Sequence, residues 1–187
     1  MKKTLTGALY CIMGLILTQC AKDNPPPISQ IIPEQEISLV SGLQLRDENG
    51  SPLGTLGNPN VLMNDTAIAI YPNPARGVMF VHATDTIQQI WMIKGTADTS
   101  FRASNFALLL NQDLYSVDKI DNAAVIPIYG INHPNVSINL DNVEIDLTGY
   151  YRIFIQLKDG TIHWDNFYKH NSNSTQDAIN QLADYWN

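Results

Sequence analysis

Positive charge is scarce in this sequence of 187 residues, in which 11 Lys and Arg stand against 18 Asp and Glu for a formal net charge of −7. Proteins that bind nucleic acid need a basic surface to meet the phosphates, so this balance argues against a nucleic-acid partner. Charged residues of both signs make up only 16% of the chain, and hydrophobic residues make up 44%. This composition excludes a disordered, collagen-like or coiled-coil chain.

Recognisable catalytic and metal-binding motifs are also missing. The sequence contains no G-x-S-x-G, P-loop or dinucleotide-binding pattern. Its histidines show neither H-E-x-x-H nor H-x-H spacing, so the sequence carries no zinc signature. The histidines are His82, His133, His163 and His170. We therefore predict no catalytic residue, no bound metal and no cofactor.

One acidic cluster admits two interpretations. Asp141, Glu144 and Asp146 lie close in the sequence to Asn139 and Asn142, and carboxylates with amides form surface calcium sites. A solvated sheet edge, whose charges discourage pairing with another chain, explains the cluster better. We expect the sheet edge.

Cysteine is almost absent, and both copies, Cys11 and Cys20, lie near the N-terminus. Two lysines precede an apolar run over residues 5–17, which is too short to span a bilayer and is typical of a signal-peptide core. The run ends in Leu-Thr-Gln-Cys at residues 17–20. This end resembles the lipobox of bacterial lipoproteins, in which the chain is cleaved before the Cys and the Cys is lipidated. The resemblance implies a signal peptide over residues 1–19 and a lipid on Cys20; the alternative is an ordinary secretory peptide with an incidental Cys.

Cleavage before Cys20 has consequences for chemistry and for attachment. It removes Cys11, so no disulfide, thiol nucleophile or cysteine metal site is expected in the mature chain. It also removes both N-terminal lysines, so a lipid, and not a basic patch, would hold the acidic chain at a membrane. Residues 20–35 contain four prolines and several polar residues, which favours an extended tether between the lipid and the folded part.

The body of the chain, residues 36–170, shows short apolar runs separated by turn residues. Regular short strands of this kind are typical of a β-sandwich or barrel, and Asn49-Gly50 is a strong hairpin signal. We expect strands over residues 36–45, 66–71, 77–82, 86–94, 123–129 and 136–140, followed by a hairpin around residues 158–161. Residues 101–133 look like an insertion between these strands.

The turn of the last hairpin predicts its register. If Asp159-Gly160 is a two-residue turn, Lys158 faces Thr161 and Ile155 faces Trp164. Pairing then fails beyond Asp165, where we expect a bulge or the end of the strand.

That register divides the hairpin into an apolar face and a mixed face. It places Phe154 on the outer, mixed face beside Gln156 and His163. An exposed Phe among polar groups is a hint of a binding surface, so these three residues are candidate ligand contacts. The alternative, which we favour, is that the C-terminal tail or the segment 101–133 covers this face.

The tail, residues 171–187, differs from the body. Ser174 with Asp177 resembles a helix capping box. Four apolar residues then fall on one face of a short amphipathic helix: Ile179, Leu182, Ala183 and Trp186. We expect this helix to pack on its own domain; binding of a partner is the alternative.

Several segments together carry a family resemblance. They are residues 70–75 (IYPNPA), 90–95 (IWMIKG), 148–151 (TGYY), 158–160 (KDG) and 166–169 (NFYK). In this order they resemble the C-terminal sorting domain of proteins that the type IX secretion system of Bacteroidota exports. The resemblance implies a small immunoglobulin-like β-sandwich over roughly residues 66–170 and an origin in that phylum. The two prolines of the YPNP segment exclude it from the centre of a sheet, so it shapes a turn between strands.

Two further tripeptides, Asp65-Thr66-Ala67 and Asp85-Thr86-Ile87, resemble the Asp-Ser/Thr-apolar motif for O-glycosylation in Bacteroidota. The resemblance implies glycans at Thr66 and Thr86.

The sequence as a whole predicts an immunoglobulin-like, all-β sandwich with a short C-terminal α-helix, lipid-anchored in the cell envelope on the periplasmic or surface face of the outer membrane. Its expected role is non-enzymatic, as a binding, adhesion or assembly module with an envelope protein or a polysaccharide as partner. Two alternatives remain open: an accessory subunit of a surface glycan-uptake or secretion complex, and a hydrolase built on dispersed carboxylates.

Overall fold

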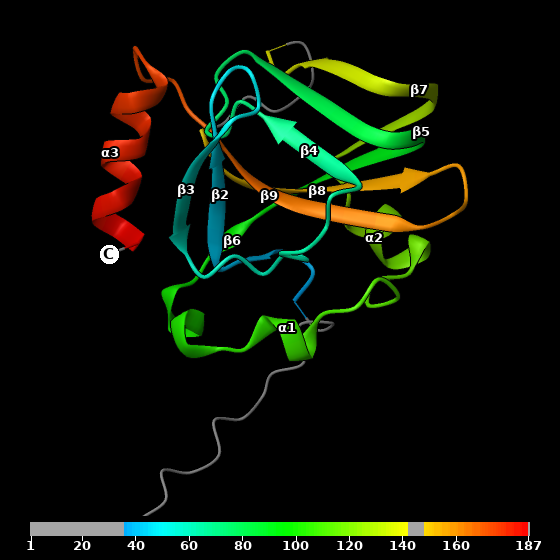
Figure 1. Ribbon diagram of the computed structural model, residues 1–187, viewed down its shortest axis with the longest axis horizontal. Helices are drawn as coiled ribbons and strands as arrows, with labels where there is room; N and C mark the ends of the chain where they lie inside the picture. Colours follow the sequence, from blue (N-terminus) through cyan, green and yellow to red (C-terminus); the bar gives the residue numbers. More distant parts are fainter. Residues whose placement is uncertain (1–35, 142–147, 187) are drawn as a thin grey trace, which may run out of the picture. The chain divides into compact units, whose positions relative to one another are not determined.

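The computed structural model describes residues 36–141 and 148–186. Strands are the main regular structure in these ranges, and the longest helix closes the chain (Figure 1). The strands are β1 (Leu39–Val40), β2 (Gly42–Arg46), β3 (Pro52–Gly57), β4 (Ile68–Tyr71), β5 (Val78–Lys94), β6 (Thr96–Ala97), β7 (Ile126–Asn139), β8 (Gly149–Leu157) and β9 (Ile162–Lys169). The helices are a 3₁₀ helix (Thr99–Ala103), α1 (Phe106–Leu109), α2 (Val117–Ala123) and α3 (Thr175–Trp186). The predicted all-β class with a C-terminal helix is therefore confirmed, and no helix in the described ranges is long and apolar enough to cross a membrane.

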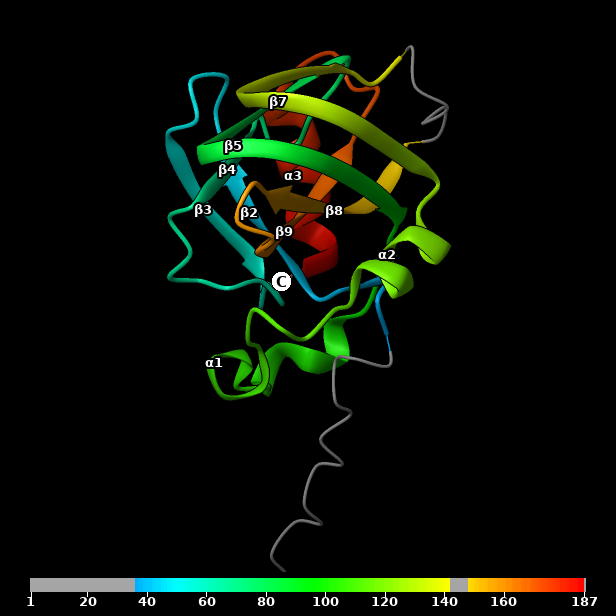
Figure 2. The ribbon, with the colours of Figure 1, turned by 90° about the vertical axis from the view of Figure 1, so that its right-hand side faces the viewer.

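Strand β5 takes part in both layers of the sandwich. One edge of β5 pairs with β4 over residues 80–83 and with β8 over residues 87–94, while β7 follows the other edge. Register shifts between His82 and Gln89 separate the two halves of β5, as expected where a strand bends. Figure 2 shows β5 and β7 as long, curved neighbours.

The first core lies between these two halves. In the first half of β5, buried Met79, Val81 and Ala83 alternate with exposed residues, which is the period of a strand covered on one face. They meet apolar residues of β8 and β9 from the other layer in a single cluster that also includes Ile153, Ile155 and Phe167.

Two pairs of strands expected from the sequence are continuous in the structure. The expected strands 77–82 and 86–94 are both part of β5, and the strands 123–129 and 136–140 are both within or next to β7. The polar residues between them, which resemble turns, stay in the ladder as register irregularities. The second strand of the Asn49-Gly50 hairpin, β3, is missing from the predicted strands, because its two glycines give it little intrinsic preference for a strand.

The β2–β3 hairpin forms a separate two-stranded sheet. Its turn is the expected Asn49-Gly50 turn, in which the Asp47 carboxylate accepts the backbone N–H groups of Asn49 and Ser51 at 2.8 Å each. Gly50 has a φ of +81°, a conformation that favours glycine.

The register predicted for the last hairpin is wrong by one residue. Phe154 pairs with Trp164 and Ile155 pairs with His163. Gly160 N–H donates to the Leu157 carbonyl at 2.9 Å, Leu157 N–H donates to the Thr161 carbonyl at 3.0 Å, and Gly160 has a φ of +88°. The loop therefore has three residues with a left-handed glycine at its end, and the ladder continues to Lys169 without the break expected near Asp165.

Because the side-chain period of a strand is two, this slip moves Phe154 and Trp164 to the same face. Both are fully or almost fully buried in a second core, which the segment between β6 and β7 covers with Phe106, Leu110 and Tyr115. The expectation of an exposed Phe154 is thus wrong, and the alternative that the segment 101–133 covers this face is correct.

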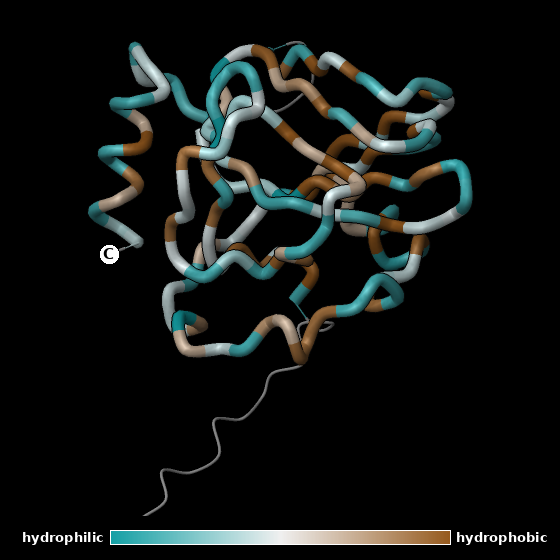
Figure 3. The backbone as a smooth tube through the Cα atoms, in the orientation of Figure 1, coloured by the Kyte–Doolittle hydropathy of each residue, from teal (hydrophilic) through white to brown (hydrophobic). Residues whose placement is uncertain are grey.

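Helix α3 packs on its own domain, as expected. The Ser174 hydroxyl accepts the N–H of Asp177 at 3.1 Å, which is the predicted cap. Leu182 and Trp186 are buried in a third core against Leu43, Leu45 and other residues of the β2–β3 hairpin. Figure 3 shows hydrophobic positions interspersed with hydrophilic ones along this helix, as the amphipathic pattern requires.

Candidate functional site

The three candidate ligand contacts lie in different surroundings. Phe154 is fully buried, with its ring 5.2 Å from the Tyr115 ring in an edge-on arrangement. Gln156 is half-buried next to the end of β8. His163 is buried, yet it lines a surface pocket. The structure therefore leaves only His163 of the three at a cavity that a ligand could enter.

We name this cavity the loop pocket; it lies between the loop of residues 61–67, Thr84 of β5 and the segment 106–112. Its volume is about 480 Å³. The apolar part of the wall is formed by Val61, Leu62, Met63, Ala67, Phe106, Ala107 and Leu110. The polar part is formed by Asn64, Asp65, Thr66, Thr84, Asn111, Gln112 and His163. Thr66, one of the two predicted glycosylation positions, is exposed at this pocket, whereas Thr86 is half-buried in β5 and does not line it.

Local hydrogen bonds shape the 61–67 loop. The N–H of Asp65 donates to the Leu62 carbonyl at 2.8 Å, and the Asp65 carboxylate accepts the N–H of Ala67 at 2.8 Å. Asp residues favour such turns because the side chain replaces a backbone acceptor. The turn directs the other carboxylate oxygen of Asp65 toward β9.

Asp65 and His163 form a close polar pair in the lining of the pocket. Asp65 Oδ2 lies 2.6 Å from His163 Nδ1, and both side chains are largely buried. Burial raises the pKa of Asp65, but the hydrogen bonds from His163 and Ala67 and the His163 charge lower it by more, so the pKa is below its ordinary value. The carboxylate is thus ionised at neutral pH and holds the imidazole in one orientation.

The other side of the imidazole contacts a hydroxyl group. His163 Nε2 lies 3.2 Å from Thr161 Oγ1, and the Thr161 hydroxyl donates to Asp159 Oδ1 at 2.6 Å. The hydrogen bond to Asp159 uses the hydroxyl proton of Thr161, and the donor in the contact between Thr161 and His163 depends on which imidazole nitrogen carries a proton. The side chains of Asp65, His163 and Thr161 are thus linked in one chain of polar contacts.

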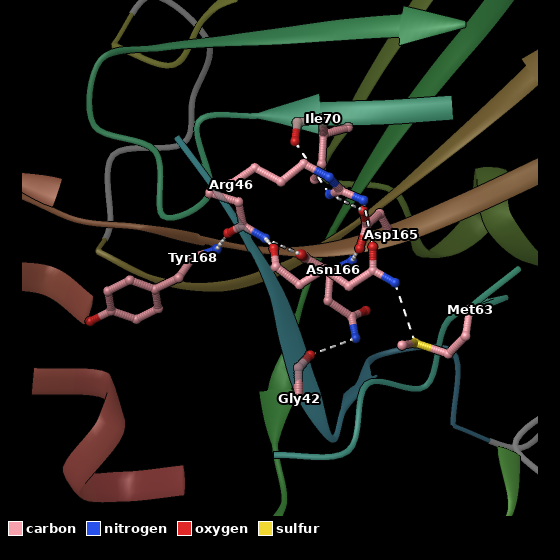
Figure 4. A network of polar contacts seen from close by, with 9 residues as sticks. Gly42, Arg46, Met63, Ile70, Asp165, Asn166 and Tyr168 are labelled. Carbon is pink, nitrogen blue, oxygen red and sulfur yellow. Dashed lines mark hydrogen bonds and ion pairs between the residues drawn. The ribbon is translucent and has the colours of Figure 1, made fainter. Parts of the chain in front are cut away.

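A second set of polar side chains is buried between β2, the YPNP turn and β9 (Figure 4). Arg46 Nη1 lies 2.9 Å from Asp165 Oδ2 and 3.4 Å from the Ile70 carbonyl, and the Arg46 guanidinium also contacts the Gln44 side chain. Burial raises the pKa of Asp165, and the Arg46 guanidinium opposes that effect. These groups satisfy one another, so we interpret the cluster as a structural connection between sheets.

Asn73 of the YPNP turn lies at the centre of this connection. Its Nδ2 donates to the Gln44 carbonyl at 2.7 Å and to the Asn166 carbonyl at 2.9 Å, while its Oδ1 accepts the N–H of Tyr168 at 3.2 Å. Its backbone also exchanges two hydrogen bonds of 3.0 Å with Arg46. The most specific segment of the family resemblance is thus the part that joins β2 to β9.

Sequence reasoning missed most of the loop pocket. Asn64, Asn111 and Gln112 carry no motif, and the pairing of Asp65 with His163 joins residues 98 positions apart in the chain. The sequence did single out His163 as a candidate ligand contact and Thr66 as a candidate glycosylation position. Nothing in the sequence indicated that these two residues line the same pocket.

Some expectations concern residues outside the described ranges. The signal peptide over residues 1–19, the lipidation site Cys20, the tether over residues 20–35 and the acidic residues Glu144 and Asp146 all belong to this group. Within residues 36–141 and 148–186, no group of three or more His, Cys, Asp or Glu side chains is arranged to hold a metal ion.

No model of a protein family matches the sequence, and no curated protein matches it. Among solved structures, the chain is similar to a DUF3244 family protein with an immunoglobulin-like β-sandwich fold from Bacteroides vulgatus. The match has a TM-score of 0.32 and 9% sequence identity, and it covers 56% of this chain and 85% of the other.

Proposed function

We propose that this chain is a lipid-anchored protein of the bacterial cell envelope whose β-sandwich is a non-enzymatic binding module, with the loop pocket as its ligand site. The observation that carries the proposal is the loop pocket itself, a cavity of about 480 Å³ with convergent polar groups on an apolar wall. Ligand sites in proteins commonly have this composition and size. The order of basic residues, apolar run and Cys20 supports the anchor.

The chemistry of the wall favours a neutral, hydroxyl-rich ligand such as a glycan segment. Asn64, Asn111 and Gln112 offer amide donors and acceptors without net charge, and Met63 and Phe106 offer apolar contact. The one carboxylate of the lining, Asp65, is already engaged with His163. The acidic net charge of the chain disfavours long-range attraction of an anionic polymer.

The residues that line the loop pocket also argue against the hydrolase alternative. Glycoside hydrolysis generally needs two carboxylates on either side of the scissile bond, and Asp65 is the only Asp or Glu among the residues that line this pocket in the described part of the chain.

We propose further that the pattern resembling a type IX sorting domain maintains the fold in this protein and is not a secretion signal. Asn73 satisfies buried groups on β2 and β9, and Lys169 donates to the Leu140 carbonyl at 3.0 Å. Helix α3 follows the last segment of the pattern and packs on the β2–β3 hairpin.

The binding proposal can be tested with the detergent-solubilised full chain. Immobilised neutral envelope polysaccharides should retain the wild-type protein, and Gln112→Ala together with Asn64→Ala should reduce retention at least fivefold. Gln88→Ala, which removes an exposed amide of β5 away from the pocket, is the matched control and should behave as wild type. Equal retention of all three proteins would contradict the proposal, and a stoichiometric protein partner in place of polysaccharide would favour the accessory-subunit alternative.

A further inference from the structure

A second cavity lies where the β2–β3 turn, the start of β5 and the connection from β9 to α3 come together. We name it the His170 pocket; its volume is about 730 Å³. Its lining consists of Glu48, Asn49, Pro72, Arg76, Gly77, Val78, Phe80, His170, Asn173, Ser174, Thr175 and Gln176. It shares no residue with the loop pocket.

His170 is the unusual residue of this lining. It is only 3% exposed, and neither of its ring nitrogens has a hydrogen-bond partner among the described residues. Buried polar groups are nearly always paired, so an unpaired imidazole beside a cavity calls for an explanation. Burial and the nearby Arg76 guanidinium lower the pKa of His170, so the ring is neutral at neutral pH and offers one donor and one acceptor.

Arg76 provides the positive charge of the His170 pocket. It is exposed at the pocket, and no ion pair or side-chain hydrogen bond joins it to another residue of the described ranges. The pocket also includes the first residues of α3, where Thr175 and Gln176 have backbone N–H groups that the helix leaves unpaired. A guanidinium, an imidazole N–H and a helix N-terminus are donors that suit a carboxylate.

The remaining lining residues suit the rest of a sugar ring. Phe80 is 41% exposed and stacks on Tyr71 with ring centroids 5.6 Å apart, so it presents an ordered aromatic face beside exposed Val78. Asn49, Gln176 and the exposed carboxylate of Glu48 can meet hydroxyl groups. A ligand that combines an apolar ring face, hydroxyls and one carboxylate would use all of these groups together.

We propose that the His170 pocket binds an acidic sugar residue, a uronate, with its carboxylate on Arg76 and His170 and its ring against Phe80. The imidazole turns slightly toward the pocket when the ligand enters, so that its N–H meets the carboxylate and its lone pair meets a hydroxyl. This site is independent of the loop pocket and of the function proposed there.

The test is a titration of the ¹⁵N-labelled full chain in detergent with single sugars. NMR chemical shifts are recorded at each step, at constant ionic strength. D-glucuronate and D-galacturonate are the probes, and D-glucose and D-galactose are the neutral counterparts. At least one uronate should give saturable shifts of the His170 ring and of the amides of Thr175 and Gln176, while its neutral counterpart gives at least tenfold weaker binding. The proposal is overturned if neither uronate saturates, if the neutral sugar binds equally well, or if the shifts are confined to the loop pocket, a result that leaves the function proposed for that pocket intact.

Variants identify the residues responsible. Arg76→Gln removes an exposed charge and should weaken uronate binding at least fivefold, whereas Lys158→Gln, an equal change of charge at the exposed β8–β9 turn, should stay within twofold of wild type. His170→Gln should also weaken binding; should that variant fail to fold, Arg76→Gln decides alone. Unchanged affinity in Arg76→Gln would refute the proposed contact.

Discussion

Asn73 shows how one side chain can connect two sheets. The buried side-chain amide of Asn73 donates to two carbonyls and accepts one N–H on β2 and β9. A buried polar group that loses its partner costs about 1–3 kcal/mol. Replacement by Ala would remove the partner of three backbone groups at once.

We therefore expect Asn73→Ala to lower the free energy of unfolding by at least about 3 kcal/mol, measured by urea denaturation followed by circular dichroism. Asn49→Ala, at an exposed position of the β2–β3 turn, is the control and should change it by less than about 0.5 kcal/mol. A loss in Asn73→Ala no larger than that of the control would show that the YPNP turn does not hold the sheets together.

Asp65 makes stability depend on pH. Its pKa in the folded protein is below the ordinary value of 3.8. A carboxyl group with a lowered pKa contributes stability that is fully present above its ordinary pKa and is lost as the pH falls through the folded-state pKa.

Asp65→Asn should accordingly destabilise the protein at pH 7 by about 1.5–3 kcal/mol, the usual contribution of a hydrogen bond to a charged group. The difference from wild type should shrink as the pH falls below 3.8, because the carboxyl group of the unfolded wild-type chain then takes up a proton while the folded chain takes one up only at lower pH. Denaturation curves at pH 7, 5 and 3 measure this, and a constant difference at all three values would mean that the charge of Asp65 contributes nothing.

At the scale of elements, the β8–β9 hairpin shows what the sequence could predict and what it could not. The existence of the hairpin and its Asp159-Gly160 turn follow from the residues. The register does not, because Asp-Gly fits both a two-residue turn and the end of a three-residue loop with a left-handed glycine. Alternation of apolar and polar residues usually decides between two registers. It is of little help here, because β8 is buried on both faces and its sequence is a nearly continuous apolar run around Phe154.

The candidate site depended on that same register. Phe154 became a candidate because the wrong phase placed it outside, and the Asp65–His163 contact depends on how a distant loop folds against β9. Local sequence carries no information on such long-range pairs. In contrast, the cap at Ser174 and the apolar face of α3 depend only on local spacing, and both were predicted correctly.

Helix α3 should contribute to stability in proportion to the apolar area that it buries. Leu182 is buried against the β2–β3 hairpin, whereas Asp184 is exposed on the same helix. We expect Leu182→Ala to reduce the free energy of unfolding by about 2–4 kcal/mol and Asp184→Ala to change it by less than about 0.5 kcal/mol. Thermal and urea unfolding measure both, and similar stability of the two variants would indicate that α3 is not firmly packed in solution.

At the scale of the whole molecule, the folded body and the proposed anchor are separable. The three hydrophobic cores are built from residues between Ile37 and Trp186. The predicted lipid is carried by Cys20, outside this range. Removing the lipid should therefore change where the protein is found without changing how it folds.

Cys20→Ala tests this separation directly. A single buried acyl chain contributes enough apolar area to bind a membrane reversibly, and several chains bind it firmly, whereas the net charge of −7 disfavours attachment of the chain to an anionic membrane by charge alone. We expect the wild-type protein in the membrane fraction and the variant in the soluble fraction, with the same β-rich circular dichroism and the same urea midpoint. Mass spectrometry of the wild-type N-terminus should show a lipid on Cys20. If the variant stays with the membrane and the wild-type chain carries no lipid, the anchor proposed on Cys20 is wrong and another part of the molecule provides the attachment.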